Sequence, residues 1–242
     1  MKLLRKFIFS ISFIFCLVWT LNYQGIDAHA QVKLDKKEVS ICRYHSVKLK
    51  VTGTKKKIKW KSSNKKIATV SQKGIVTGVS EGSTTITAKI KNSTYKCKVT
   101  VYDYDEHTQL AAYGEKALNE IMKKKNKLEI KKVWQGSLQS NVPFACFVCK
   151  FVDNAGKKQN ACVYVYESEM KSTSYHNIKT NYYEAPLTLK FVNGEMDDVL
   201  KQRSSKLKMS KVKECQKILF QTESIKVSKG KNFKVLHTWL NL

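Results

Sequence analysis

The sequence predicts a mainly β fold, in which an antiparallel β-sandwich is followed by a small α+β domain made of a helix and an antiparallel sheet. Two observations predict it. From Val32 to Val101, short apolar segments alternate with a period of two residues, and turn residues separate them at intervals of about eight to twelve residues, which is typical of an antiparallel sandwich. After residue 104, apolar residues recur at helical spacing and then alternate again.

The predicted strands of the sandwich place one apolar side chain inward at every second position. The inward residues are Val39, Ile41, Val47, Leu49, Val51, Ile58, Trp60, Ile67, Val70, Val76, Ile86, Ala88, Tyr95, Cys97, Val99 and Val101. The turns between them contain Gly53, Gly74, Gly82 and Asn92. Trp60 is large enough to fill the middle of so small a sandwich, and Gly74 and Gly82 stand where turns need a positive φ.

A pattern at fixed spacing within this segment resembles the bacterial immunoglobulin-like domain, group 2. It runs Trp60-x-Ser62-Ser63-Asn64-x-x-Ile67-Ala68-x-Val70, then Gly74-x-Val76-x-Gly78-x-x-x-Gly82, then Ile86-x-Ala88. The resemblance covers residues 32–103 and implies an Ig-like β-sandwich that serves as a spacer or adhesive unit beside another functional domain. One position departs from the family, which usually carries a glycine near Tyr44, where this chain has Arg43-Tyr44-His45.

The first thirty residues read as an export signal. Lys2, Arg5 and Lys6 precede an apolar stretch at 7–21, and Ala28-His29-Ala30 forms a small-x-small cleavage site before Gln31. The alternative is an uncleaved membrane anchor, although the apolar stretch is shorter than the roughly 20 residues that a spanning helix needs. We therefore expect a signal peptide at 1–30, an Ig-like domain at 31–103 and an α+β domain of unknown function at 104–242, located extracellularly or at the cell surface.

Within 104–242, the apolar residues from Leu110 to Met122 predict a helix that begins near Asp105-Glu106. Alternating segments predict strands at 128–134 and 187–192 and a hairpin of 144–152 with 161–166. A helix is expected at 195–208, and further short strands are expected in the last thirty residues.

The chain is strongly basic, with 45 Lys and Arg against 19 Asp and Glu and a net charge of +26. Without the signal peptide, 42 basic and 18 acidic residues remain, which leaves +24. Behind an export signal, such a charge favours an anionic cell-wall polymer, an acidic glycan or an anionic lipid surface as the partner, and no nucleic acid is expected. The alternative is a lysine-rich composition without a specific partner, because the lysines are spread along the whole chain.

Six cysteines remain after cleavage, namely Cys42, Cys97, Cys146, Cys149, Cys162 and Cys215. If the hairpin turns over residues 154–157, Cys149 falls opposite Cys162, which makes this pair the candidate disulfide. Cys97 points into the sandwich whereas Cys42 points out of it, so these two are not expected to pair. Cys146 and Cys149 lie three apart on one strand and point to opposite faces, so neither a metal nor another cofactor is expected there.

No arrangement in the sequence indicates catalysis. His107, His176 and His237 lack the sequence context of a catalytic base, and Asp197-Asp198 is interpreted as the start of the helix at 195–208. The protein is therefore predicted to be non-catalytic. The alternative is an exported enzyme with an unrecognised active site in 104–242, which would need a concave pocket with converging histidine, cysteine or carboxylate side chains.

A stretch rich in tyrosine and lysine is the candidate binding face of the second domain, since tyrosines beside lysines can stack on sugars or contact anionic polymers. It comprises Tyr164, Tyr166, Lys171, Tyr175, Lys179, Tyr182 and Tyr183. The alternative places Tyr164 and Tyr166 in the strand core and the rest on a surface loop. By the first interpretation the sandwich presents a basic C-terminal domain to a polymer or glycan. A further hypothesis is a structural envelope protein that charge holds on anionic wall polymers.

Overall fold

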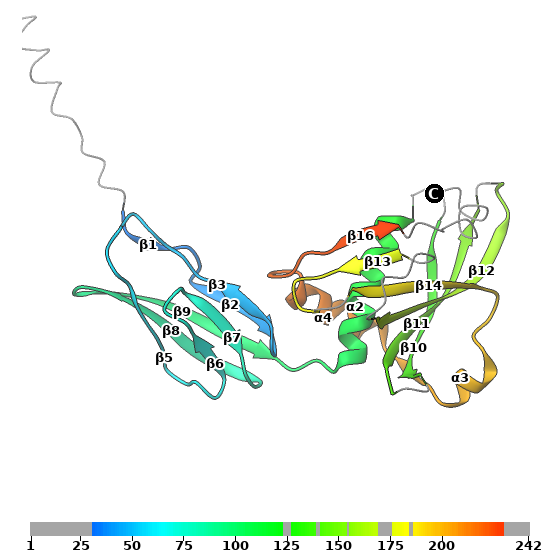
Figure 1. Ribbon diagram of the computed structural model, residues 1–242, viewed down its shortest axis with the longest axis horizontal. Coiled ribbons are helices and arrows are strands. Elements are labelled where there is room, and N and C mark those ends of the chain that lie inside the picture. Colours follow the sequence, from blue (N-terminus) through cyan, green and yellow to red (C-terminus); the bar gives the residue numbers. More distant parts are fainter. Residues whose placement is uncertain are drawn as a thin grey trace, which may run out of the picture.

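The computed structural model describes residues 31–122, 127–138, 141–153, 155–168, 176–183 and 186–229. It confirms the predicted mainly β fold, with a β-sandwich followed by an α+β domain (Figure 1). The predicted signal peptide at 1–30 lies outside the described residues. Among the described residues, no helix combines the length and the apolar character needed to cross a membrane.

The N-terminal sandwich contains two main sheets. The four-stranded sheet has the order β2 (Glu38–Cys42), β9 (Ser93–Tyr102), β8 (Gly82–Ile90), β5 (Lys59–Ser62), and the three-stranded sheet has the order β3 (Ser46–Lys48), β7 (Ile75–Gly78), β6 (Ala68–Val70). β1 (Lys33–Leu34) pairs with β4 (Val51–Thr52). The sandwich is not wholly antiparallel, because β2 runs parallel to β9. Both strands consequently end beside the C-terminal domain (Figure 1).

Most of the predicted inward positions are buried in the core of the sandwich. Ala68, which the prediction did not include, is buried there as well, whereas five predicted positions are only partly buried, namely Val51, Ile58, Ile67, Val70 and Tyr95. Trp60 is buried there, and the backbone at Gly74 passes close to its ring. Gly74 has φ +77°, and an added Cβ would lie 2.6 Å from the carbonyl oxygen of Leu49 and 3.0 Å from the indole. Only glycine fits this turn, since both the backbone conformation and the available space exclude a side chain.

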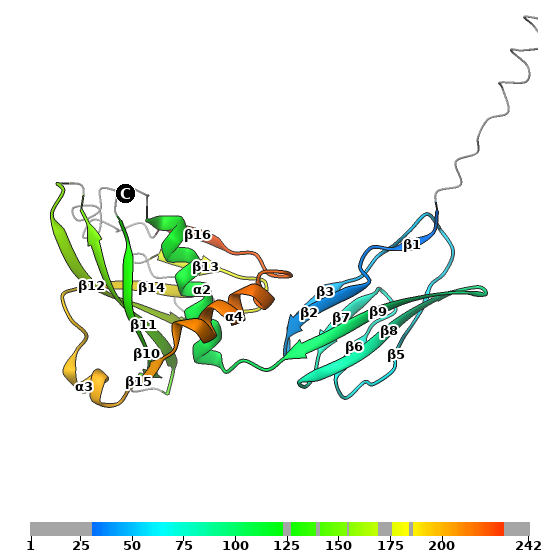
Figure 2. The ribbon, with the colours of Figure 1, turned by 180° about the vertical axis from the view of Figure 1, so that it is seen from behind.

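The C-terminal domain is built on one antiparallel seven-stranded sheet. Its order is β15 (Ser205–Leu207), β10 (Glu129–Ser137), β11 (Pro143–Val152), β12 (Lys158–Glu167), β14 (Leu187–Asn193), β13 (His176–Lys179), β16 (Lys226–Lys229). Helices α2 (Glu106–Ile121) and α4 (Met209–Leu219) pack together, and α2 also packs on β11 and β12. Figure 2 shows both helices on the side of the sheet that faces the N-terminal sandwich. The short helix α3 (Asp198–Gln202) lies away from them.

Helix α2 confirms the helix predicted from residue 105 onward. Asp105 is its N-cap, and its carboxylate accepts a hydrogen bond from the backbone N–H of Thr108 at 2.8 Å. Gly114 lies where α2 crosses the sheet, and an added Cβ would stand 2.4 Å from Val165 and 2.8 Å from Phe147. The helix can approach β11 and β12 this closely because residue 114 has no side chain.

The prediction for the last third of the chain is partly wrong. The expected helix at 195–208 is only α3, because the chain after it pairs with the edge of the sheet, where Leu207 lies opposite Val133. Helix α4 follows, and its second half lies in the last thirty residues, where the prediction placed only short strands. Its buried residues Val212, Cys215 and Leu219 recur at helical spacing, so the signal was present in the sequence.

The predicted register of the β11–β12 hairpin is wrong by one residue. Cys149 lies opposite Ala161, and Cys162 lies opposite Val148. The turn is one residue longer than predicted, because two hydrogen bonds close it between Asp153 and Lys157. The backbone N–H of Asp153 donates to the carbonyl oxygen of Lys157, and the carboxylate of Asp153 accepts from the backbone N–H of Lys157 at 2.8 Å. A shift of one residue moves a side chain to the other face of a strand. The proposed Cys149–Cys162 disulfide is therefore incompatible with this sheet.

Candidate functional site

The outer side of the four-stranded sheet in the N-terminal sandwich carries five exposed lysines. Strand alternation turns Trp60, Ile86 and Cys97 inward, and the residues beside them consequently point to solvent. We call this set the lysine face; it consists of Lys59, Lys61, Lys89, Lys96 and Lys98.

The lysines of this face are close neighbours across the strands. Lys59 and Lys89 are directly opposite one another, and Lys96 and Lys98 lie opposite Thr87 and Thr85. Like charges that lie directly opposite one another destabilise a sheet by about 0.2–1 kcal/mol. β5, β8 and β9 contain no acidic residue. Within the described part of the chain, none of the five lysines forms a salt bridge. On the adjacent strand β2, Glu38 lies opposite Lys98, so the lysine face has one acidic neighbour at its edge and keeps an excess of positive charge.

The net charge is distributed unequally between the two domains. Residues 31–103 contain 18 basic and 4 acidic residues, a net charge of +14, whereas residues 104–242 contain 24 basic and 14 acidic residues, a net charge of +10. The N-terminal domain is about half as long as the C-terminal domain, but its net positive charge is larger. The sequence interpretation placed the binding of a polymer on the second domain, and the charge distribution favours the first.

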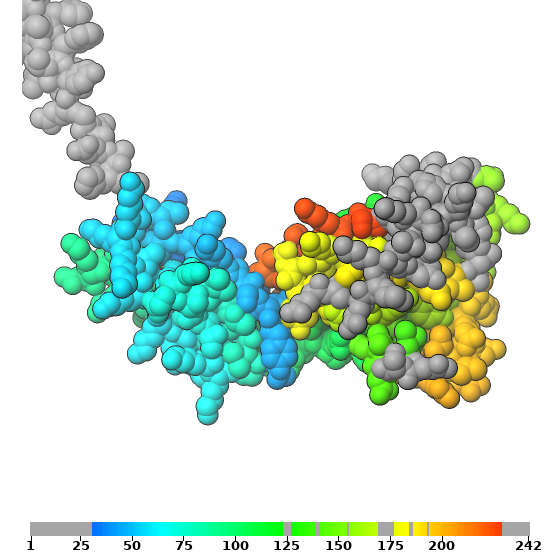
Figure 3. Space-filling view, viewed as in Figure 1, coloured from blue at the N-terminus to red at the C-terminus, as the bar shows by residue number. Residues whose placement is uncertain are grey.

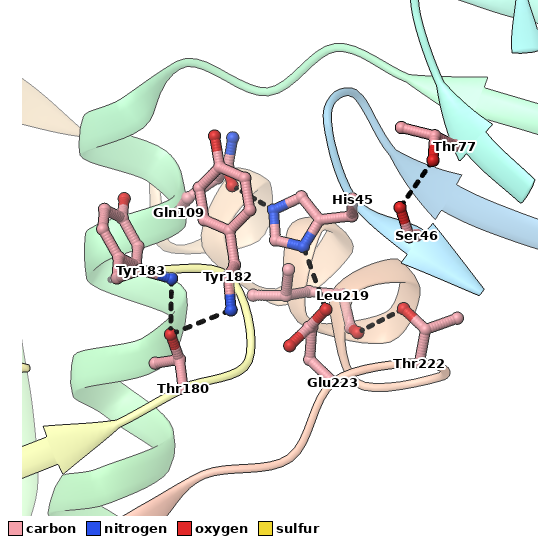
Figure 4. Close-up of polar contacts among 10 residues, drawn as sticks. All are labelled: His45, Ser46, Thr77, Gln109, Thr180, Tyr182, Tyr183, Leu219, Thr222 and Glu223. Carbon is pink, nitrogen blue, oxygen red and sulfur yellow. Dashed lines mark hydrogen bonds and ion pairs between the residues drawn. The ribbon is translucent and has the colours of Figure 1, made fainter. Parts of the chain in front are cut away.

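A second distinctive site is the junction between the domains, which the segment Arg43-Tyr44-His45 forms. His45 is 1% exposed, and its ring stacks on that of Tyr182 with centroids 3.9 Å apart. Its Nε2 lies 2.9 Å from Oε1 of Gln109, and its Nδ1 lies 3.2 Å from Oε1 of Glu223 (Figure 4). The space-filling view shows the corresponding contact of the two domains (Figure 3). His45, which belongs to the segment that departs from the family pattern, thus docks on the C-terminal domain.

The backbone of this segment is unusual. Tyr44 has φ +66°, a conformation that favours glycine, and it stands near the position where the family usually carries that residue. Its ring is 56% exposed, and the guanidinium of Arg43 lies 4.5 Å from the ring centroid. Arg43 also forms a salt bridge of 2.8 Å with Asp103 in the linker between the domains. Hydrogen bonding to Asp103 raises the pKa of the Arg43 guanidinium above its usual value.

The C-terminal domain contains an open groove of about 1190 Å³. His107, Asp197 and Arg203 line it. The Nε2 of His107 lies 3.1 Å from the carbonyl oxygen of Gly136, and Oδ1 of Asp197 accepts hydrogen bonds from the first turn of α3. Asp197 therefore begins that helix, as the sequence predicted. The printed hydrogen bonds of His107 and Asp197 thus go to the backbone of the protein itself.

The cysteines do not resemble catalytic thiols. All six in the described residues are buried, and the structure joins no two of them in a disulfide bond. Burial raises the pKa of Cys97 to about 11 and that of Cys149 to about 12, so both remain protonated at neutral pH. Cys97 lies in the core of the sandwich, as predicted. Within the described residues, no group of three or more histidine, cysteine or carboxylate side chains has the arrangement of a metal site.

The structure divides the predicted tyrosine- and lysine-rich face. Tyr164 and Tyr166 line a pocket of about 420 Å³ on the side of the sheet that carries α3. Tyr182 lies against His45 at the junction, and Tyr183 packs against the core beneath the helices, where burial raises its pKa. Lys179 ends β13, and Lys171 and Tyr175 lie outside the described residues.

The fold and the junction together define a two-domain β protein with an immunoglobulin-like sandwich at its N-terminus. The family model of the bacterial Ig-like domain (group 2) matches residues 28–101, which confirms the resemblance for this segment. A comparison with curated proteins gives no match.

Solved structures that resemble the chain include domains of the S-layer protein SbsC. Domains 4 and 5 have 30% sequence identity and a TM-score of 0.25, and the match covers 29% of this chain and 50% of that one. Domains 5–6 have 17% identity and a TM-score of 0.28, and the match covers 68% of this chain and 83% of that one. TM-scores this low do not establish a common overall architecture, so no functional conclusion follows from them.

Proposed function

We propose that this protein is exported by a signal peptide at 1–30 and acts without catalysis at the cell surface, where the lysine face of its Ig-like domain binds an anionic polymer of the envelope. The observation that supports the proposal is the group of five exposed lysines on one side of the four-stranded sheet, where Glu38 opposite Lys98 is the acidic neighbour. A phosphate- or carboxylate-bearing polymer can span several of these charges at once. Such a ligand would also remove the repulsion between Lys59 and Lys89.

Binding of this kind depends on salt, because exposed charges are screened over a Debye length of about 8 Å at physiological ionic strength. The test measures the affinity of the chain for poly(glycerol phosphate), with neutral dextran as the uncharged comparison, between low and high NaCl. We expect binding to the anionic polymer that weakens steeply as salt rises, and no binding to dextran.

The test must also separate the lysine face from overall charge. Replacing its five lysines with glutamine should lower the affinity at least about tenfold, since several contacts with the polymer are lost together. The matched control replaces Lys55, Lys56, Lys57, Lys65 and Lys66, which are also exposed but lie in the loops around β5. That control removes the same charge and should change the affinity much less. Equal losses in the two variants would refute a specific face and leave only general electrostatic attraction.

A second candidate function concerns the C-terminal domain. The pocket beside Tyr164 and Tyr166 shares Leu138, Asp197 and Leu200 with the larger groove, so the two form one continuous concave surface. Aromatic rings beside polar groups are suited to a sugar ring. We propose that a glycan is bound there. Tyr166→Ala should abolish this binding, which should persist at high salt, whereas insensitivity to the substitution would exclude this site.

A further inference from the structure

Two buried cysteines from different domains meet at the junction. Cys42 is the last residue of β2; Val39 and Ile41 of this strand face the core of the sandwich, whereas Cys42 belongs to the core of the C-terminal domain. Cys215 lies on the buried side of α4, which packs against β2. Both side chains belong to the same buried hydrophobic cluster, and the neighbouring thiol of Cys42 raises the pKa of Cys215. Cys42 and Cys215 are 1% and 0% exposed, so both thiols are shielded from solvent.

The other buried thiols are arranged differently. Cys97 and Cys149 donate to the backbone carbonyls of Lys98 and Phe147. Cys162 donates to the backbone carbonyl of Gly194. Cys146 and Cys162 are diagonal neighbours on adjacent strands, since Cys146 lies opposite Tyr164. Diagonal neighbours are separated by about 7–8 Å between their Cα atoms, which exceeds the usual span of a disulfide. The pair at the junction is not subject to that limit, because a helix meets a strand end there.

We propose that Cys42 and Cys215 form a disulfide bond in the exported protein, and that this bond covalently fastens the Ig-like domain to helix α4. The noncovalent contacts of His45 already position the two elements, so the bond closes a junction that the fold has assembled. Export places the chain outside the reducing cytosol, where disulfides persist. The proposal is independent of polymer binding, which rests on the lysine face.

The oxidant is a second disulfide, either a small molecule such as oxidised glutathione or a disulfide of a thiol oxidoreductase. One thiol loses its proton and attacks a sulfur of the oxidant, whose S–S bond breaks and whose first half leaves as a thiol. The second cysteine then attacks the mixed disulfide, the Cys42–Cys215 bond forms, and the other half leaves as a thiol. Overall two protons and two electrons pass to the oxidant, and one S–S bond replaces another.

The order of events follows from burial. In the docked state, the neighbouring thiol of Cys42 and burial raise the pKa of Cys215 above its usual range, and no oxidant can reach either sulfur. The exchange therefore occurs while the domains are still docking, after which the bond is shielded from reductants.

The test maps the thiols of the full-length chain after refolding in a buffer of oxidised and reduced glutathione. Free thiols are blocked with N-ethylmaleimide in denaturant, and the chain is digested with trypsin without reduction. Cleavage after Lys37, Arg43, Lys213 and Lys217 releases Cys42 in the peptide 38–43 and Cys215 in the peptide 214–217. We expect these two peptides to be joined in most of the protein, at a mass two hydrogen atoms below their sum, and to separate after reduction.

The variants distinguish the bond from random oxidation. Cys215→Ala should leave the peptide 38–43 blocked by maleimide, whereas Cys149→Ala, which removes an equally buried thiol, should leave the linked pair unchanged. Circular dichroism checks that the unmodified chain is folded in the same samples. Recovery of both peptides with blocked thiols from the folded, unmodified chain would overturn the proposal, as would a link from Cys42 to any other cysteine.

Discussion

His45 of the Ig-like domain hydrogen-bonds Gln109 of helix α2 across the domain junction, with 2.9 Å between Nε2 and Oε1. The amide of Gln109 is held in place because its nitrogen donates to the carbonyl of Tyr104 at 2.9 Å. On the other side of the ring, Nδ1 faces the carboxylate of Glu223. Both ring nitrogens therefore face side-chain oxygen atoms of the C-terminal domain. One buried side chain thus joins the sandwich to two separate segments of the C-terminal domain.

Replacing His45 with alanine should destabilise the protein by about 1–3 kcal/mol, because the side chain of Glu223, 4% exposed, loses its partner while it stays buried. Urea unfolding followed by circular dichroism measures the change in the free energy of unfolding. Ser46→Ala is the matched control, since its hydroxyl contacts only Thr77 within the sandwich in Figure 4 and is exposed. Equal effects of the two substitutions would show that the junction contributes no stability.

Tyr44→Gly should be more stable than Tyr44→Ala by about 1 kcal/mol, although both remove the exposed ring. Residue 44 has φ +66°, which an alanine side chain opposes and glycine adopts without strain. Thermal unfolding of the two variants and the parent gives the comparison. If the alanine variant were equally stable, the positive φ at the junction would not be a source of strain.

Gly114→Ala should destabilise the C-terminal domain by about 1–3 kcal/mol, even though alanine is the better helix former. The added Cβ would lie 2.4 Å from Val165 and 2.8 Å from Phe147, so helix α2 would have to move away from the sheet. Lys116→Ala, at an exposed position of the same helix, should change the free energy of unfolding by less than about 0.5 kcal/mol. A stabilised Gly114→Ala variant would contradict the close packing.

The contact between α2 and α4 should make stability depend on pH. Burial acts to raise the pKa of Glu115, but hydrogen bonds from Lys213, Gln216 and Asn119 outweigh it and lower the pKa below its usual value. A carboxyl whose pKa is lowered by folding stabilises the folded state above the pKa of the unfolded chain, about 4.3, and loses this contribution as the pH falls through the folded value.

Glu115→Gln should therefore cost about 1–3 kcal/mol at pH 7, because its amide nitrogen would face donors, and the difference from the parent should shrink below about pH 4. Urea unfolding across this pH range measures it. Glu120→Gln removes a carboxylate that is exposed and lies 3.7 Å from Lys116, so it should have little effect at either pH. A difference that stays constant with pH would show that the charge of Glu115 does not stabilise the contact.

Much of the fold could be predicted because it depends on local patterns. The alternation of Val39 with Ile41 and the spacing of Leu110 with Leu118 are visible without knowledge of the rest of the chain. Helix α4 was detectable in the same way from Val212, Cys215 and Leu219. The hairpin register was not, since the extra turn residue depends on how Asp153 bonds to Lys157.

The candidate sites likewise depend partly on local patterns and partly on long-range structure. The exposed positions of the lysine face follow from strand alternation, but their arrangement as one group depends on which strands are neighbours, and strand order is a long-range property. The sequence could mark Arg43-Tyr44-His45 as a departure from a family pattern and no more.

By itself, then, the sequence determined the class of fold, the sandwich and its core, and the excess of positive charge, because each follows from composition and from periods of two or about four residues. Tertiary structure decided that His45 meets Gln109 and Glu223 and that Cys42 and Cys215 belong to one buried cluster. These partners lie far apart in the chain, and only the packing of one domain against the other brings their side chains together.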